Sequence, residues 1–165
     1  MKKLFVLLAA IAASVSVSVS AGTPVNESEL PQAAKTFIST HFSGVQIKKV
    51  EKDQGRRGME FEVDFVGGAE VDFTSDGNWK EVKAAKGNAV PAAVVPAAIA
   101  KYVADNFSGQ AIVEISRKRG GFEVELANGT ELKLTEDAKP MPAPQRGEGP
   151  RGNGPRGERP RGGNR

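Results

Sequence analysis

Apolar and acidic residues alternate strictly between residues 60 and 73, around the pair Gly67-Gly68. Side chains of a β-strand point alternately to its two faces, and a Gly-Gly pair suits a tight turn. The stretch therefore predicts a β-hairpin with one apolar face and one acidic face. The apolar positions are Phe61, Val63, Phe65, Val71 and Phe73.

The hairpin pattern occurs a second time, between residues 122 and 134, with Asn128-Gly129 at the turn. Asn-Gly is a strong signal for a two-residue hairpin turn. The second apolar face is formed by Phe122, Val124, Leu126, Leu132 and Leu134.

A helical pattern precedes each hairpin. One begins at Leu30-Pro31 and the other, 65 positions later, at Val95-Pro96, and apolar residues follow each at helical spacing. Proline suits the first helical turn, where an amide hydrogen would have no partner. Both patterns end at Phe-Ser-Gly, and the glycine can take the left-handed conformation that ends a helix. Strands are expected next, around residues 47–52 and 112–117.

The two copies differ after the hairpin. Asp76-Gly77 predicts another turn and a fourth strand over residues 79–83, whereas the second copy passes from residue 137 into a proline-rich tail. Its fourth strand should be absent or rudimentary. We therefore predict an α+β fold of two tandem helix-plus-antiparallel-meander repeats, about 29–83 and 94–137. Two helices would pack on one face of a mainly antiparallel sheet of about seven strands.

Both ends of the chain fall outside this domain. Residues 1–21 have two lysines, an apolar and serine-rich stretch and a small-residue ending at Val19-Ser20-Ala21, typical of a cleaved secretory signal. Residues 138–165 are rich in proline, glycine and arginine, with no apolar residue after Pro144. Such a tail cannot bury enough apolar surface to order itself, so we expect it to be disordered. Residues 22–137 remain as one domain.

Charge is distributed unevenly along the chain. The whole chain carries +3; setting aside the two signal lysines and the net +5 of the tail leaves −4 on the domain. There is no cysteine, which excludes disulfides and thiol chemistry.

Catalysis has little support in the sequence. His41 is the only histidine, it lies near the end of the first helix, and its counterpart is Asn106. A metal centre built from histidine and cysteine is excluded by count. We expect no catalytic residue, no metal ligand set and no cofactor, and the protein should not be an enzyme.

The acidic hairpin face is the candidate binding surface, together with the only tryptophan, Trp79. Facing like charges destabilise a sheet, so their accumulation can indicate a basic partner or a divalent cation such as Ca²⁺. The alternative is a solvated face neutralised by Lys48, Lys80 or neighbouring strands, with Trp79 in the core. No loop has the ligand spacing typical of calcium sites. The candidate residues are Glu60, Glu62, Asp64, Glu70, Asp72 and Trp79.

The arginine tail has several interpretations. It could attract an anionic envelope polymer or lipid headgroups, fold back on the acidic domain, or only increase solubility. The export signal and the lack of aromatic residues in the tail argue against nucleic acid. The candidate polyanion-binding residues are Arg146, Arg151, Arg156, Arg159, Arg161 and Arg165.

Several of these motifs resemble the PepSY-like exported proteins, a family similar in fold to β-lactamase inhibitor proteins. They are Leu-Pro opening a helix, the Phe-Ser-Gly ending, Phe-Glu-Val-Asp-Phe before a glycine turn, and the segment Asp76-Gly77-Asn78-Trp79 ahead of a second proline-opened copy. The resemblance covers about residues 29–136 and implies a periplasmic, non-catalytic domain. It provides no catalytic or ligand residues, and the arginine tail is not part of the family pattern.

The leading hypothesis is thus an exported binding module that binds or restrains another envelope protein. The alternatives are a periplasmic protein that binds a small ligand or cation at the acidic hairpin face, and an envelope protein that binds polyanions through its tail.

Overall fold

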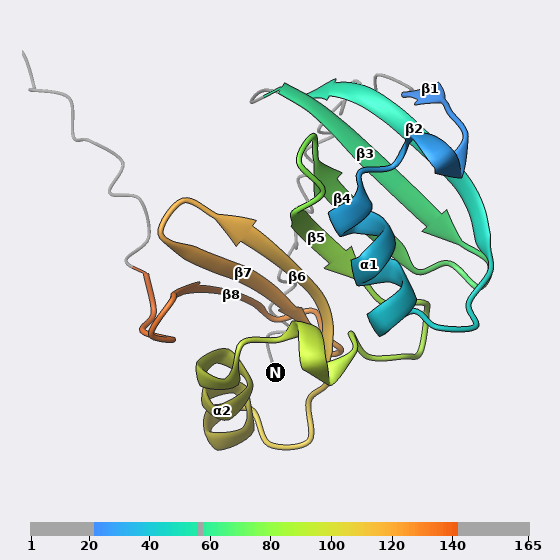
Figure 1. The fold of residues 1–165 in the computed structure, drawn as a ribbon. Coiled ribbons are helices and arrows are strands. Elements are labelled where there is room, and N and C mark those ends of the chain that lie inside the picture. Colours follow the sequence, from blue (N-terminus) through green and yellow to red (C-terminus); the bar gives the residue numbers. More distant parts are fainter. Residues whose placement is uncertain (1–21, 56–57, 142–165) are drawn as a thin grey trace, which may run out of the picture.

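The computed structural model describes residues 22–55 and 58–141, so the predicted signal and most of the predicted tail lie outside the described residues. One antiparallel sheet contains eight strands in sequence order (Figure 1). The strands are β1 (Thr23–Pro24), β2 (Ile47–Gly55), β3 (Gly58–Phe65), β4 (Glu70–Thr74), β5 (Trp79–Lys83), β6 (Ile112–Lys118), β7 (Gly121–Leu126) and β8 (Glu131–Thr135). The helices are α1 (Gln32–His41) and α2 (Ala97–Asn106), each preceded by a 3₁₀ turn, η1 (Glu27–Glu29) or η2 (Ala92–Val94).

Both helices lie on the same face of the sheet, α1 over the first repeat and α2 over the second (Figure 1). The apolar face of each hairpin is buried beneath them, as the alternation predicted. Phe65 and Phe73 are at most 1 % exposed, and the Phe42 ring stacks on Phe65 with centroids 4.6 Å apart. The predicted α+β architecture of two helix-plus-meander repeats is confirmed.

The helix ends follow the sequence signals. Pro31 and Pro96 stand directly before α1 and α2. An amide hydrogen at this position would have no acceptor within the helix, so its absence in proline costs no hydrogen bond. Gly44 and Gly109 both have φ of 78°, the left-handed conformation that lets the chain leave each helix.

The repeats join edge to edge into one continuous sheet. β5 pairs with β6, with Val82 opposite Ile115. The connection after β5 continues along β6, where the amides of Ala84 and Val90 donate to the carbonyls of Val113 and Ile112. The join, which we call the seam, makes one core from two copies.

The structure departs from prediction at both ends of the domain. The short strand β1 brings the number of strands to eight, where about seven were expected. The expected boundary at residue 138 is too early, because Ala138 is only 8 % exposed and the Met141 amide donates to the carbonyl of Lys133. In the second repeat, a single bridge between Leu134 and Pro140 takes the place of a fourth strand. The fourth strand of the second repeat is therefore rudimentary, as predicted.

No helix among the described residues is both long enough and apolar enough to span a membrane.

Candidate functional site

The sheet face opposite the helices is lined with carboxylates. They project from the seven strands β2 to β8. Residues that flank the buried positions of each strand point away from the core. We call this surface the acidic face, and its carboxylates are those of Glu51, Asp53, Glu60, Glu62, Asp64, Glu70, Asp72, Glu81, Glu114, Glu123, Glu125 and Glu131.

The strand register sets several of these carboxylates directly opposite one another. Glu51 pairs with Glu62, Glu62 with Asp72, and Asp72 with Glu81, which makes one acidic row across β2, β3, β4 and β5. Like charges facing each other across strands are destabilising. The row is therefore a feature that sheet stability alone does not favour.

Asp72 lies in the middle of this row and is the most perturbed carboxyl group. Burial, followed by the negative charges of Glu81, Glu70 and Glu62, raises the pKa of Asp72 to about 7. Its Oδ1 atom is buried and accepts no hydrogen bond from the described residues. Burial also raises the pKa values of Glu62, Glu70 and Glu114. Ionisation of the carboxyl groups at the centre of the acidic face therefore costs free energy in the folded state.

Lysines neutralise the acidic face mainly at its margins. Lys80, which the alternative of a neutralised face names, forms an ion pair with Glu60. At the other margin Lys49 takes the place expected of Lys48, with its Nζ 3.0 Å from Glu51 and 3.1 Å from Asp64. A β-bulge between Ile47 and Lys49 shifts the alternation of β2, which turns Lys49 to the acidic face.

In the second repeat, Lys133 and Lys118 lie 3.0 Å and 3.5 Å from Glu123 and hold its pKa below its ordinary value. Among the described residues, no lysine or arginine nitrogen lies within 4 Å of a carboxylate of Glu62, Asp72 or Glu81. The middle of the row is left without a direct ion pair.

Glu62 of the row and two neighbouring carboxylates converge closely enough to share a cation. One oxygen each from Glu62, Asp64 and Glu70 lies within 4.8 Å of the other two. Oxygen ligands of this kind suit Ca²⁺ and other hard cations.

Trp79 does not belong to this surface. It pairs with buried Phe73 and lies on the helix side of the sheet, where its ring centroid is 6.3 Å from those of Phe37 and Phe122. The structure brings the five predicted acidic residues together on one face and places Trp79 on the other. It also adds carboxylates that the sequence did not single out as candidates, among them Glu81 and Glu114. Glu81 escaped the sequence pattern because the register shift in β4 and β5 places Lys80 and Glu81 on the same face.

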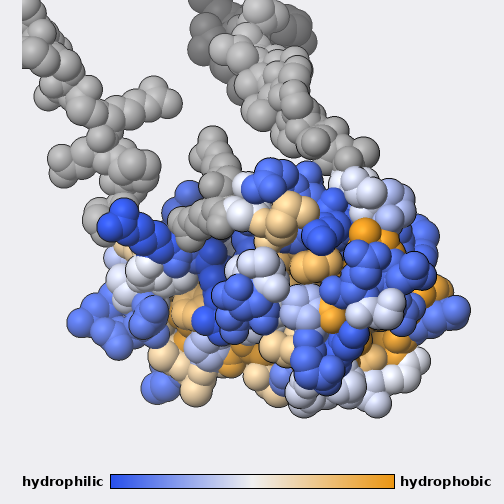
Figure 2. Space-filling model, turned by 45° about the horizontal axis from the view of Figure 1, so that its top comes forward, coloured by the Kyte–Doolittle hydropathy of each residue, from blue (hydrophilic) through white to orange (hydrophobic). Residues whose placement is uncertain are grey.

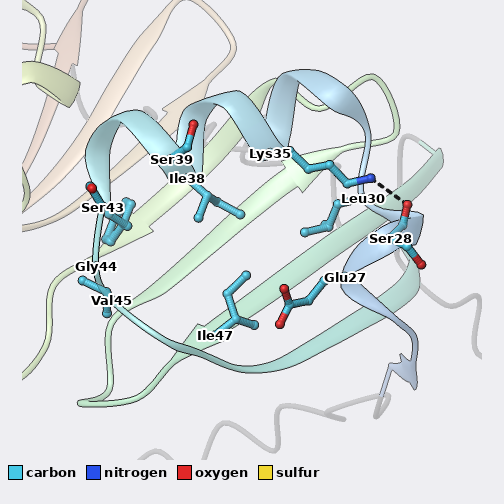
Figure 3. Close-up of a pocket in the computed structure, with 11 residues that line it drawn as sticks. Glu27, Ser28, Leu30, Lys35, Ile38, Ser39, Ser43, Gly44, Val45 and Ile47 are labelled. Carbon is cyan, nitrogen blue, oxygen red and sulfur yellow. Dashed lines mark hydrogen bonds between the residues drawn. The ribbon is translucent and has the colours of Figure 1, made fainter.

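A groove lies between helix and sheet in each repeat. The groove of the first repeat has a volume of about 500 Å³ and that of the second about 380 Å³. Leu30, Ile38 and Ile47 line the first groove, and their counterparts 65 positions later line the second. Figure 3 shows the first groove beneath α1, with the Glu27 carboxylate directed into it and Lys35 Nζ donating to the carbonyl of Ser28.

Apolar surface is also exposed near the first groove. Val45 is 41 % exposed and Val66 is 54 % exposed, and the Val66 amide donates to the carbonyl of Gln46 next to Val45. Figure 2 shows apolar patches breaking an otherwise hydrophilic surface. The candidate tail arginines, from Arg146 to Arg165, lie outside the described residues and remain a prediction.

Comparison with known proteins agrees with this architecture. Residues 17–64 and 59–139 match the family described as "Putative beta-lactamase-inhibitor-like, PepSY-like". No curated protein matches the chain.

Three solved structures are similar to the chain. A "putative calcium-regulated periplasmic protein" from Bacteroides thetaiotaomicron is 35 % identical, with a TM-score of 0.68 over 73 % of this chain and 94 % of its own. A putative periplasmic protein from Bacteroides vulgatus is also 35 % identical, with a TM-score of 0.70 over 75 % of this chain and 97 % of its own. A second one from that organism, of unknown function, is 30 % identical, with a TM-score of 0.67 over 71 % and 93 %.

Proposed function

Because this chain belongs to the PepSY-like, β-lactamase-inhibitor-like family, we propose that it is a non-enzymatic periplasmic binding module that recognises a basic segment of another envelope protein. The acidic face is the recognition surface. Restraint of the bound protein is the functional outcome that the inhibitor-like family description supports.

The observation that carries this proposal is the acidic row through Glu62, Asp72 and Glu81. Its carboxylates face one another across strands and have no direct ion pair among the described residues. A surface that holds uncompensated charge is suited to a partner of opposite charge, which it also attracts over a distance. Natural proteins accept such local instability where it supports binding.

The test is a crosslinking capture from a native envelope extract with the mature chain and the triple variant Glu62→Gln, Asp72→Asn, Glu81→Gln. We expect the mature chain to capture a basic protein that moderate salt releases, and the variant to lose it. The variant should also be more stable than the parent, because its facing charges are gone.

The matched control neutralises three acidic residues away from this face, Glu27, Glu29 and Asp105. This variant should retain the captured protein. If both triple variants capture the same protein as the parent, the acidic face is not the recognition surface and the proposal fails.

A second candidate function is cation binding at Glu62, Asp64 and Glu70. The convergence of their oxygens within 4.8 Å favours it, as does the similarity to the Bacteroides thetaiotaomicron protein described as a "putative calcium-regulated periplasmic protein". Extracellular calcium modules bind with dissociation constants of roughly 0.1–1 mM. Ca²⁺ that binds only the folded chain would raise its melting temperature.

This candidate is tested by thermal unfolding in about 5 mM CaCl₂ or MgCl₂, concentrations that exceed such dissociation constants. Binding predicts a rise in melting temperature with Ca²⁺ that the double variant Glu62→Gln, Glu70→Gln does not show. An unchanged melting temperature of the parent chain would remove the ion from consideration and leave the protein partner.

A further inference from the structure

The seam between the repeats holds a pocket on the helix side of the sheet, away from the acidic face. Its volume is about 260 Å³, and it is lined by Ala33, Phe37, Gly77, Asn78, Trp79 and Arg117. Phe37 comes from α1, Trp79 from β5 and Arg117 from β6, so the pocket exists only because the second repeat pairs with the first.

Arg117 lies over the aromatic rings of this seam. Its Cζ atom is 4.1 Å from the centroid of Trp79 and 5.6 Å from that of Phe122. Stacking on an indole holds the guanidinium plane through the ring quadrupole. A guanidinium carries five N–H donors, so a contact between Arg117 and the rings leaves donors available for other partners.

Those donors find no partner among the described residues. Arg117 is exposed, no carboxylate oxygen of the described residues lies within 4 Å of it, and it donates no hydrogen bond there. The side-chain amide of Asn78, on the same pocket wall, has no hydrogen-bond partner in that part of the chain either. A guanidinium beside an amide and an aromatic wall provides donors that suit a carboxylate.

The internal repeat provides a comparison for this pair. Lys52 is the counterpart of Arg117, and its Nζ lies 5.6 Å from the centroid of Phe61, the counterpart of Phe122. A cation over an aromatic ring is thus common to both repeats. This contact alone therefore does not indicate a binding site. Only Arg117 of the second repeat also lies over a tryptophan, Trp79 of the first repeat, has the forked donors of arginine and lines a pocket.

We propose that this seam pocket binds a carboxylate presented by a polypeptide, either an acidic side chain or a chain terminus, with Arg117 as the anchor. A volume of about 260 Å³ is below the ~300–1,000 Å³ typical of small-molecule sites and suits one side chain. Tryptophan and arginine are also among the residues most enriched at binding hot spots. The chain therefore has two recognition surfaces of opposite preference, on opposite faces of the sheet.

The test follows the fluorescence of Trp79, the only tryptophan, during titration with three pentapeptides. One contains glutamate and is blocked at both ends, one carries glutamine with a free carboxyl terminus, and one carries glutamine with both ends blocked. We expect saturable binding of at least one carboxylate peptide and none of the neutral peptide. The first two peptides distinguish a side chain from a terminus as the source of the carboxylate.

Isothermal titration of variants identifies the anchor independently of the fluorophore. Arg117→Gln should abolish binding, and Arg117→Lys should weaken it about tenfold because lysine lacks the bidentate fork. Lys52→Gln, which removes the repeat counterpart, should bind as the parent does. Melting temperatures of all three variants confirm that they fold.

Equal binding of the parent and Arg117→Gln would overturn the proposal, as would no binding of either carboxylate peptide at several millimolar. This inference does not rest on the proposed function. The triple variant of the acidic face should still bind the carboxylate peptides, so failure at one face is distinguishable from failure at the other.

Discussion

At the scale of single residues, Asp72 links the stability of the sheet to the charge of its acidic face. The unfolded chain ionises this carboxyl near its ordinary pKa of 3.8, whereas the folded chain ionises it near 7. The folded state therefore binds a proton that the unfolded state releases between these values. It follows that ionisation of Asp72 opposes folding, fully so above about pH 7 and not at all below about pH 4.

The corresponding prediction concerns Asp72→Asn. As pH rises from 4 to 8, the parent should lose roughly 2–4 kcal/mol of unfolding free energy relative to this variant. Denaturant unfolding at several pH values measures the difference. Glu131→Gln, at an exposed carboxylate of β8, is the control and should follow the parent. A difference between parent and Asp72→Asn that does not change with pH would contradict the burial of this charge.

At the scale of elements, the turn between β4 and β5 fits closely against the start of α1. Gly77 has φ of 82°, and a Cβ atom there would lie 2.7 Å from the Ala34 nitrogen and 2.9 Å from the Pro31 Cβ. The glycine thus satisfies both a turn conformation and a close approach of turn and helix. It also lets Asn78 and Trp79 form one wall of the seam pocket.

Gly77→Ala should therefore destabilise the protein both through the left-handed backbone conformation and through the clash with α1. The variant Gly87→Ala separates these two contributions. Gly87 has a similar φ of 81° but nothing within 4 Å of a built Cβ, so its substitution costs only the left-handed conformation, about 1–2 kcal/mol. We expect Gly77→Ala to cost roughly 1–3 kcal/mol more, because the helix must shift. Denaturant unfolding tests this. Equal losses of unfolding free energy in the two variants would show that α1 shifts without a measurable cost.

At the scale of the whole molecule, charge is divided between an acidic domain and a basic tail. The charges are −4 for residues 22–137 and +5 for residues 138–165. Opposite charges on one chain attract at low ionic strength and are screened above about 0.1 M salt. We therefore expect the tail to compete with a basic partner for the acidic face.

We expect the mature chain of residues 22–165 to be more stable at low salt than a chain ending at Met141, with the two converging at high salt. The truncation keeps residues 138–141, because Ala138 is buried and Met141 bonds to Lys133. Thermal unfolding of both chains across a salt series tests the expectation. Identical melting at every salt concentration would show that the tail does not associate with the domain.

Much of the fold followed from local patterns. Alternation around Gly67-Gly68 identified the buried face, and the 65-residue repeat predicted two helices that end at Gly44 and Gly109. The five predicted acidic residues do share one face. These features depend on backbone geometry over a few residues, which sequence periodicity reports directly.

The sequence by itself thus determined the two repeats, their buried and acidic faces and their helix ends, since each is set by neighbours along the chain. Only the tertiary structure decided which residues meet across strands and repeats. Bulges turned Lys49 and Glu81 to the acidic face, and pairing of β5 with β6 brought Arg117 over Trp79, 38 positions away. The physical reason is that register and strand pairing are fixed by contacts between distant segments, which no local pattern encodes.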